Sequence, residues 1–198
     1  MANGHGNSPG EMPERRAASL QVLYLRDWIY GGMDGTVTTF AVAAGAAGAG
    51  LSPSVVIVMG LANLIADGFS MAAGNFVSSR AERDNDERLL AIAQGPVPPI
   101  PDDQSQVAAI VRSPLTAALC TFAAFAIFGL VPLLPYLASA GFLASTIATA
   151  ITFFVIGAAK SRWSLRPAWK SGLETLAIGG SAAILAFGTG FLLARWFA

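Results

Sequence analysis

The sequence predicts an all-α membrane protein with five transmembrane helices. Of its 198 residues, 54% are hydrophobic and 12% are charged, against about 25% charged residues in a typical soluble domain. No charged residue lies between Asp34 and Asp67, or between Arg112 and Lys160, and each interval has room for two helices of about 20 residues joined by a turn. A further uncharged tract at 176–194 supplies the fifth helix.

These tracts and their flanking residues place the five helices at 28–50, 54–78, 114–134, 139–159 and 172–194. The segment ahead of them, residues 1–19, contains Gly, Pro, Asn and charged residues without an apolar core. This composition predicts a disordered tail and not a cleaved signal. The transporter domain is therefore expected at 20–198.

The first helix carries small residues at a spacing of three or four, namely Gly31, Gly35, Gly45 and Gly48. Small side chains at this spacing let helix backbones approach closely in lipid, where the hydrophobic effect gives no drive for association. We therefore expect these glycines to lie at a helix interface. The alternative is that Gly is simply common in membrane helices.

The second helix is expected to continue past the membrane into the cytoplasm, because good helix formers follow Ser78 with no Gly or Pro before Gly95. Four prolines at 96–101 then predict a stiff extended stretch. A short helix at 104–112 leads into the third membrane helix. The whole connection at 79–113 is expected to be a short cytoplasmic linker.

The basic residues predict the orientation in the membrane. Eleven of the twelve Lys and Arg residues precede the first helix or follow the second and fourth helices, and only Arg195 lies on the other side. Short loops rich in Lys and Arg stay in the cytoplasm. We therefore expect the amino terminus inside and the carboxyl terminus outside, in the plasma membrane of a bacterium-like cell. Because these residues serve topology and the formal net charge is zero, no basic patch remains for nucleic acid.

The second helix contains an aspartate, Asp67, near the middle of its apolar stretch. A carboxylate at bilayer depth costs at least about 2.5 kcal/mol, so such residues usually serve an ion, a proton or a substrate. Residues four apart share a helix face, and Asn63, Asp67, Met71 and Asn75 therefore form one polar and sulfur-bearing stripe. The stripe predicts a cation path. The structural alternative is that Asp67 bonds Ser70 or a neighbouring helix.

Asp34 in the first helix and Met71 in the second are expected at similar depths and can meet across the helix pair. A hard carboxylate with a soft thioether suits Fe(II) or Mn(II) better than Mg(II), which prefers an all-oxygen octahedron. We expect these metals as transported ions, with no permanently bound cofactor. In a homodimer, closely spaced copies of Asp34 and Asp67 would take up protons as the metal leaves. The alternatives are a structural Asp34 and a Met71 that only packs.

Further acidic residues support weaker hypotheses. Glu82 and Asp86 share a face of the extended second helix, where they would concentrate cations at an entrance; ordinary ion pairs with the interspersed arginines explain them equally well. Glu174 opens the fifth helix, either as a secondary site or as a charge that favours the helix amino terminus. Cys120 is the only cysteine, which excludes a Cys-based metal cluster.

Four stretches of the chain carry a family resemblance: DGTVTTFAVAAGAAGAG, GLANLIADGFSMAAGNFVSSRAE, SPLTAAL and SGLETLAIGG. They resemble the vacuolar iron transporter family, which includes the yeast vacuolar calcium, manganese and iron carrier and plant nodulin-like members. The resemblance covers residues 20–196. It implies a five-helix, dimeric carrier that moves Fe(II), and often Mn(II), out of the cytoplasm in exchange for protons. It also implies that Asp34 and Met71 occupy the family's intramembrane metal-handling positions.

Two features depart from the iron-type members of that family. Those members tend to have a glutamate in place of Asn63 and an acid in place of Asn75, so Asp67 is the only charge in this stripe. They also insert a cytoplasmic helical domain with Glu and Met ligands between the second and third helices, where this chain has only residues 79–113. We therefore expect a short member that lacks most of the cytoplasmic metal-binding domain.

These observations predict a transporter and not an enzyme: a homodimer in the bilayer that exports iron or manganese by proton antiport, for metal homeostasis. A second class stays open because the cytoplasmic segment is short, namely a non-transporting scaffold or metal-responsive regulator that keeps the fold. Transport of calcium or another hard cation is a third alternative, in which Met71 would be dispensable.

Overall fold

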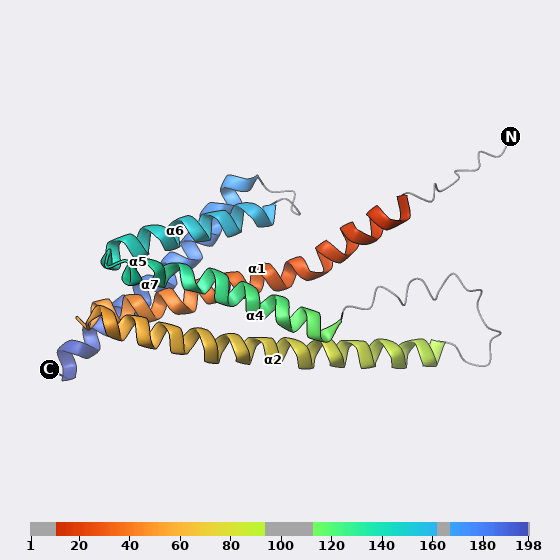
Figure 1. Cartoon of the computed structure of the whole chain (residues 1–198), viewed down its shortest axis with the longest axis horizontal. Helices are drawn as coiled ribbons and strands as arrows, with labels where there is room; N and C mark the ends of the chain where they lie inside the picture. Colours follow the sequence, from red (N-terminus) through yellow and green to blue (C-terminus); the bar gives the residue numbers. More distant parts are fainter. Residues whose placement is uncertain (1–10, 94–112, 162–166, 198) are drawn as a thin grey trace.

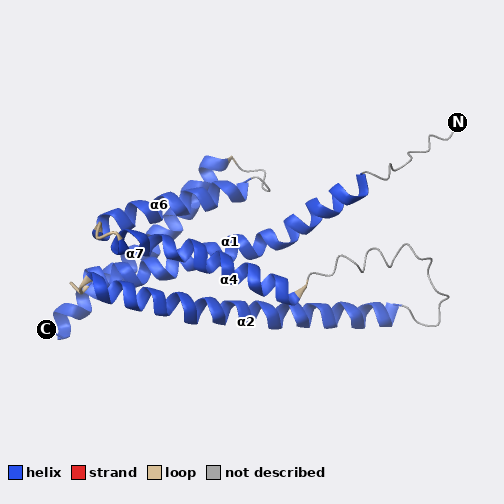
Figure 2. Ribbon diagram, viewed as in Figure 1, coloured by secondary structure: helices blue, strands red, loops and turns tan. Residues whose placement is uncertain are grey.

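The computed structural model describes residues 11–93, 113–161 and 167–197, and within them every regular element is a helix (Figure 2). In chain order these are α1 (Glu11–Gly48), α2 (Pro53–Ala93), α4 (Pro114–Leu130), the short 3-10 helix η1 (Val131–Leu133), α5 (Leu134–Leu137), α6 (Gly141–Lys160) and α7 (Ala168–Phe197). The predicted all-α class is confirmed. The stiff stretch and short helix expected at 96–112 lie outside the described residues.

Four helical segments of the described chain are long and apolar enough to cross a membrane: Pro53–Leu89, Pro114–Leu137, Gly141–Lys160 and Ala168–Phe197. The helix α1 has the length but is not among them, because Asp34 and several threonines and glycines lower its mean hydropathy. Its position suits this composition, since α1 contacts α2, α4, α6 and α7 and so lies within the bundle (Figure 1). A fifth membrane span therefore stays a prediction.

The helices α1 and α2 project beyond the bundle at the same end (Figure 1). They have 38 and 41 residues, about 57 and 62 Å at a rise of 1.5 Å per residue, or roughly twice the thickness of the hydrocarbon layer. The helix α1 already runs through residues 11–19, part of the stretch expected to be disordered. The continuation of the second helix past Ser78 is confirmed, and it takes up residues 79–93 of the expected linker.

Most of the described Lys and Arg residues lie toward this projecting end of the bundle. Arg80, Arg83 and Arg88 lie in the second half of α2, where Arg80 and Arg83 are close to the start of α4, and α6 ends and α7 begins on the same side (Figure 1). Arg195, in the last turn of α7, lies at the opposite end. The start of α1 and the end of α7 are thus at opposite ends of the bundle (Figure 1).

The third expected helix, 114–134, is interrupted by η1 because Pro132 has no backbone N–H to donate to the carbonyl of Phe128, four residues earlier. That carbonyl instead accepts from the backbone N–H of Val131 and, at 3.4 Å, from the Thr36 hydroxyl of α1. Ser145 of α6 donates a 2.6 Å hydrogen bond to the Pro132 carbonyl. The break is therefore tied to both neighbouring helices.

The glycines of α1 lie where it packs against other helices of the same chain. A Cβ atom at Gly31 or Gly35 would collide with the backbone of α4, and one at Gly48 with the backbone of α7. Gly45 also faces α7, where a Cβ would be 3.5 Å from the carbonyl oxygen of Ala186. Small residues thus allow close approach on two sides of α1.

Candidate metal-binding site

The polar stripe of α2 faces a matching stripe on α1, its antiparallel neighbour across a short turn at 49–52. Asp34 of α1 lies close enough to Asp67 of α2 for their carboxylates to repel each other. Toward the projecting end, Asn75 of α2 donates a 2.8 Å hydrogen bond to Asp27 of α1. The two pairs are seven residues apart on α1 and eight on α2, which is about two helical turns on each helix.

Asn75 links three helices. Its Nδ2 donates to Asp27, to the Ala117 carbonyl at 3.3 Å and to the Thr121 hydroxyl of α4, while its Oδ1 accepts a 3.1 Å hydrogen bond from Ser79. Asp27, Ser79 and Thr121 are only 4%, 3% and 1% exposed. Both ends of the amide are therefore engaged with protein groups, whereas the sequence predicted that Asn75 faces the cation.

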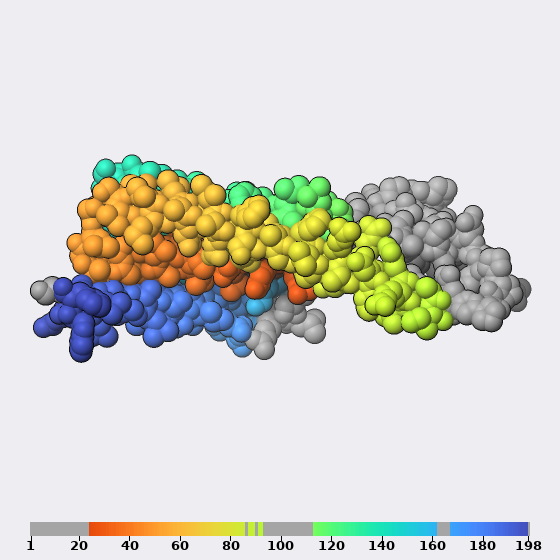
Figure 3. All heavy atoms as spheres, turned by 90° about the horizontal axis from the view of Figure 1, so that it is seen from below, coloured from red at the N-terminus to blue at the C-terminus, as the bar shows by residue number. Residues whose placement is uncertain are grey.

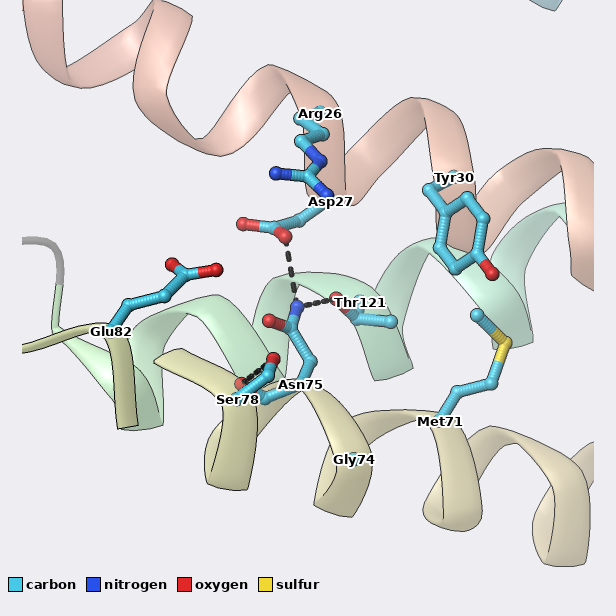
Figure 4. Close-up of a pocket in the computed structure, with 9 residues that line it drawn as sticks. All are labelled: Arg26, Asp27, Tyr30, Met71, Gly74, Asn75, Ser78, Glu82 and Thr121. Atoms are coloured by element: carbon cyan, nitrogen blue, oxygen red, sulfur yellow. Dashed lines mark hydrogen bonds between the residues drawn. The ribbon is translucent and has the colours of Figure 1, made fainter. Parts of the chain in front are cut away.

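A cleft of about 350 Å³ opens beside this network, between α1, α2 and α4 (Figure 4). Its lining includes Arg26, Asp27 and Tyr30 of α1 and Met71, Asn75 and Glu82 of α2. The Asp27 and Glu82 carboxylates point toward one another, and the Met71 thioether points toward the Tyr30 ring (Figure 4). With two carboxylates and one guanidinium, the lining has a formal charge of −1, next to amide, hydroxyl and sulfur donors.

The other two members of the α2 stripe lie on either side of Asp67. Met71 lines the cleft and packs against the apolar core. It is one turn from Asp67, the residue that faces Asp34. Asn63 is half-buried one turn in the other direction, and its buried Nδ2 has no hydrogen-bond partner among the described residues.

The weaker acidic candidates, Glu82, Asp86 and Glu174, do not come together at one site in the described structure. Glu82 lines the cleft, and Asp86 lies in α2 with its side chain outside the described part of the chain. An ordinary ion pair of 3.0 Å joins the exposed Arg83 and Glu87. Glu174 is exposed on α7, which packs against α1 and α6, and does not line the cleft.

Asp27 is the residue of this region that sequence reasoning missed. It lies between Arg26 and Trp28, where an acidic residue reads as an ordinary charge at the membrane boundary. The signal that identifies it is spacing: Asp27 is seven residues before Asp34 and so shares its face of α1. The partner stripe on α2 has almost the same spacing, from Asp67 to Asn75.

The arrangement suits transient binding of a dication and not a closed metal cage. No group of three or more His, Cys, Asp and Glu side chains comes together among the described residues. The Asp34 and Asp67 carboxylates therefore supply part of a coordination shell, which water or further protein groups must complete. A divalent ion between them would remove their mutual repulsion.

Comparison with known proteins relates this chain to a single family. A family model described as the VIT family matches residues 25–112 and 101–191. A "Vacuolar iron transporter 1" of Eucalyptus grandis is 29% identical, with 94% of this chain and 96% of the relative covered. A "Vacuolar iron transporter" of Toxoplasma gondii is 29% identical over 86% of this chain and 74% of its own length, and a "Vacuolar iron transporter 1" of Arabidopsis thaliana is 26% identical over 82% and 83%.

The relative from Eucalyptus grandis differs from this chain in length. The alignment with the Eucalyptus grandis protein runs over 238 positions, more than the 198 residues of this chain, so the relative contains residues without a counterpart here. The two matched segments of the family model overlap at 101–112, between α2 and α4 in the sequence.

Proposed function

Because the chain belongs to the VIT family, we propose that it moves Fe(II) or Mn(II) out of the cytoplasm in exchange for protons. The family resemblance seen in the sequence is confirmed, and relatives named as vacuolar iron transporters support a role in metal transport. The choice of metal, the direction and the proton exchange are the proposal.

The observation that carries this proposal is the pair of neighbouring carboxylates, Asp34 of α1 and Asp67 of α2, which interact electrostatically within the helix bundle. Two negative charges held together at membrane depth are unfavourable unless a cation or a proton accompanies them. A dication that enters satisfies both groups. When it leaves, protons replace it, and this alternation is the basis of antiport.

The proposed topology has five spans, with α1 as the fifth. Its polar composition is tolerated because the other long helices surround it. The projecting end of the bundle, which carries Arg80, Arg83, Arg88 and Lys170, faces the cytoplasm by the positive-inside rule. In a bacterium-like cell this orientation in the plasma membrane corresponds to export.

A homodimer would complete the path. The helix α2 covers one face of the molecule, with a strip of α1 visible between it and α7 (Figure 3). Asp34 and Asp67 are half-buried along this helix pair. A second copy packed on this face would bring a second carboxylate pair to the same ion.

Flux in proteoliposomes tests the proposal. Vesicles that contain the full chain, acidic inside and loaded with a metal-sensitive dye and a pH dye, should take up external Fe(II) or Mn(II) while their lumen becomes less acidic. Asp34→Asn and Asp67→Asn should each lower metal uptake at least tenfold, because each removes half of the facing pair. Asp84→Asn, at an exposed carboxylate on α2, should have little effect.

The competing functions give different results in the same assay. A scaffold or regulator gives no uptake with the unmodified chain. A calcium carrier takes up Ca(II) and is insensitive to Met71→Ala. Undiminished uptake in both aspartate variants would reject the mechanism itself.

A further inference from the structure

A groove of about 380 Å³ lies at the surface where α4 begins beside α2, and it shares no lining residue with the cleft beside Asn75. Its lining includes Phe76, Arg80 and Asp84 of α2 and Leu115 of α4. We propose that this α2–α4 groove binds a phospholipid with a primary ammonium group, such as phosphatidylethanolamine, with its phosphate at Arg80 and its ammonium at Asp84. Such a site requires only that the chain lies in a membrane, and it is independent of metal transport.

The α2–α4 groove lies at the level where the apolar surface of the helices gives way to charge. Arg80 is the first charged residue of α2 after Asp67, and the apolar helix α4 begins at Pro114. Leu115 of the lining is 60% exposed, and Leu119, one turn further along α4, is 59% exposed. In a multi-pass membrane protein, acyl chains cover such leucines, and the headgroups of the same lipids lie at the level where long basic side chains reach the interface.

Two opposite charges in the groove are available to a ligand. Arg80 and Asp84 both line it and are exposed, four residues apart on α2. No ion pair joins these two described residues, whereas Arg83 and Glu87, also in the lining, form one at 3.0 Å. The second pair therefore satisfies itself, and the Arg80 guanidinium and the Asp84 carboxylate remain for a ligand that carries both charges.

The charge of the lining favours a zwitterionic headgroup over an anionic one. Two arginines and two acidic residues line the groove, so its formal charge is zero, and an anionic headgroup attracted by Arg80 would be repelled by Asp84. A guanidinium donates paired hydrogen bonds to phosphate oxygens. A primary ammonium has three N–H donors for a carboxylate, and the quaternary ammonium of phosphatidylcholine has none. Phosphatidylethanolamine therefore matches both ends of the site.

The start of α4 adds hydrogen-bond donors beside the position proposed for the phosphate. Ser113 lines the groove, and its Oγ accepts a 3.4 Å hydrogen bond from the backbone N–H of Thr116, so its own hydroxyl hydrogen can still be donated. The first N–H groups of a helix have no partner within it, and this end of the helix favours negative charge. The phosphate is thus favoured at the α4 side of the groove.

Native mass spectrometry of the full chain in detergent tests the site. Phosphatidylethanolamine, phosphatidylcholine and phosphatidylglycerol with identical acyl chains are titrated, and the Kd of the first bound lipid is compared. We expect phosphatidylethanolamine to bind at least fivefold more tightly than the other two. Arg80→Gln should weaken its binding severalfold. Asp84→Asn should abolish its advantage over phosphatidylcholine and strengthen phosphatidylglycerol, because the groove then has a net positive charge.

Controls separate a specific site from general charge and from folding. Arg88→Gln, at an exposed arginine of α2 outside the lining, should leave all three affinities unchanged. Each variant must elute as a single species in gel filtration, which is expected because Arg80 and Asp84 are exposed. Metal uptake in proteoliposomes should be unaffected by Asp84→Asn, since the groove lies apart from Asp34 and Asp67.

The results decide the proposal in either direction. Equal affinity for the three lipids overturns it, as does a preference of the unmodified chain for phosphatidylglycerol, or a preference for phosphatidylethanolamine that survives Asp84→Asn. Glycerophosphoethanolamine, the headgroup without acyl chains, should bind at least tenfold more weakly, and equal binding would overturn a lipid site. A preference that is lost in Asp84→Asn and kept in Arg88→Gln supports the site, whatever the chain transports.

Discussion

Asp34 of α1 and Asp67 of α2 face each other closely enough for their carboxylates to repel, and both side chains are half-buried within their helices. Two turns away, the same helix pair holds Asp27 and Asn75 in a 2.8 Å hydrogen bond. One helix pair thus holds an acid–acid pair, Asp34 and Asp67, and an acid–amide hydrogen bond between Asp27 and Asn75, about two helical turns apart. The difference between them gives a direct stability prediction.

In metal-free protein, Asp67→Asn should raise the temperature of unfolding by a few degrees, because the new amide can donate to Asp34 as Asn75 donates to Asp27. Mn(II) should raise the unfolding temperature of the unmodified chain and have a smaller effect on the variant, since a ligand stabilises only the state that binds it. A thermal unfolding series with and without Mn(II) measures both. A variant that is less stable without metal would contradict the repulsion.

The glycines of α1 give a second prediction. Gly35→Ala places a Cβ against the backbone of α4 at Phe125, and backbone cannot move aside as a side chain can, so we expect a loss of about 1–3 kcal/mol. Gly74→Ala is the matched control, because a Cβ there meets nothing within 4 Å. It should be neutral or stabilise by about 0.5–1 kcal/mol, since Ala restricts the unfolded chain and favours helix. Denaturation in detergent compares the pair, and equal effects would contradict the packing argument.

Much of the fold could be predicted because it depends on local composition. The uncharged tracts located the four apolar spans, and the ends of α6 at Gly141 and Lys160 lie within two residues of the sequence estimate. The start of α1 at Glu11 differs because charge and low hydropathy suggested disorder, whereas the chain from Glu11 onward contains many good helix formers. Pro132 is visible in the sequence as a cause of the η1 break, but the sequence does not show that Thr36 of α1 bonds the Phe128 carbonyl that Pro132 leaves without its helical partner.

Some residues of the candidate site could also be identified from the sequence, whereas others required the structure. Asp34 and Asp67 stand out in sequence because each is an isolated charge beside a long uncharged tract. Asp27 does not, because its burial results from packing between α1, α2 and α4. The role of Asn75 was also invisible, since an amide in a stripe with Asp67 reads as a ligand until its partners on α4 are known. Pairing of two helices in space, and not the sequence of either, decides these two assignments.

Met71 provides a prediction about metal choice. It lines the cleft and packs against the apolar core, so Met71→Ala would mix loss of sulfur with loss of packing. Met71→Leu keeps most of the volume and removes the thioether. We expect it to lower uptake of Fe(II) several times more than uptake of Ca(II), because sulfur contributes to binding of softer ions. Competition flux between the two ions measures the ratio, and an unchanged ratio would assign Met71 to packing alone.

Gly74 offers a way to close the cleft without removing any charge. It lines the cleft, and a Cβ there meets nothing within 4 Å, so Gly74→Phe should fill the space beside Asp27 without displacing the backbone of a neighbouring helix. We expect uptake of Mn(II) in proteoliposomes to fall at least tenfold. Gly180→Phe on α7 is the control, because that position is equally open and does not line the cleft; it should leave uptake within about twofold of the unmodified chain. If both variants transport equally well, cations do not pass through this cleft, and the route from the basic end to Asp34 and Asp67 must lie elsewhere along the helix pair.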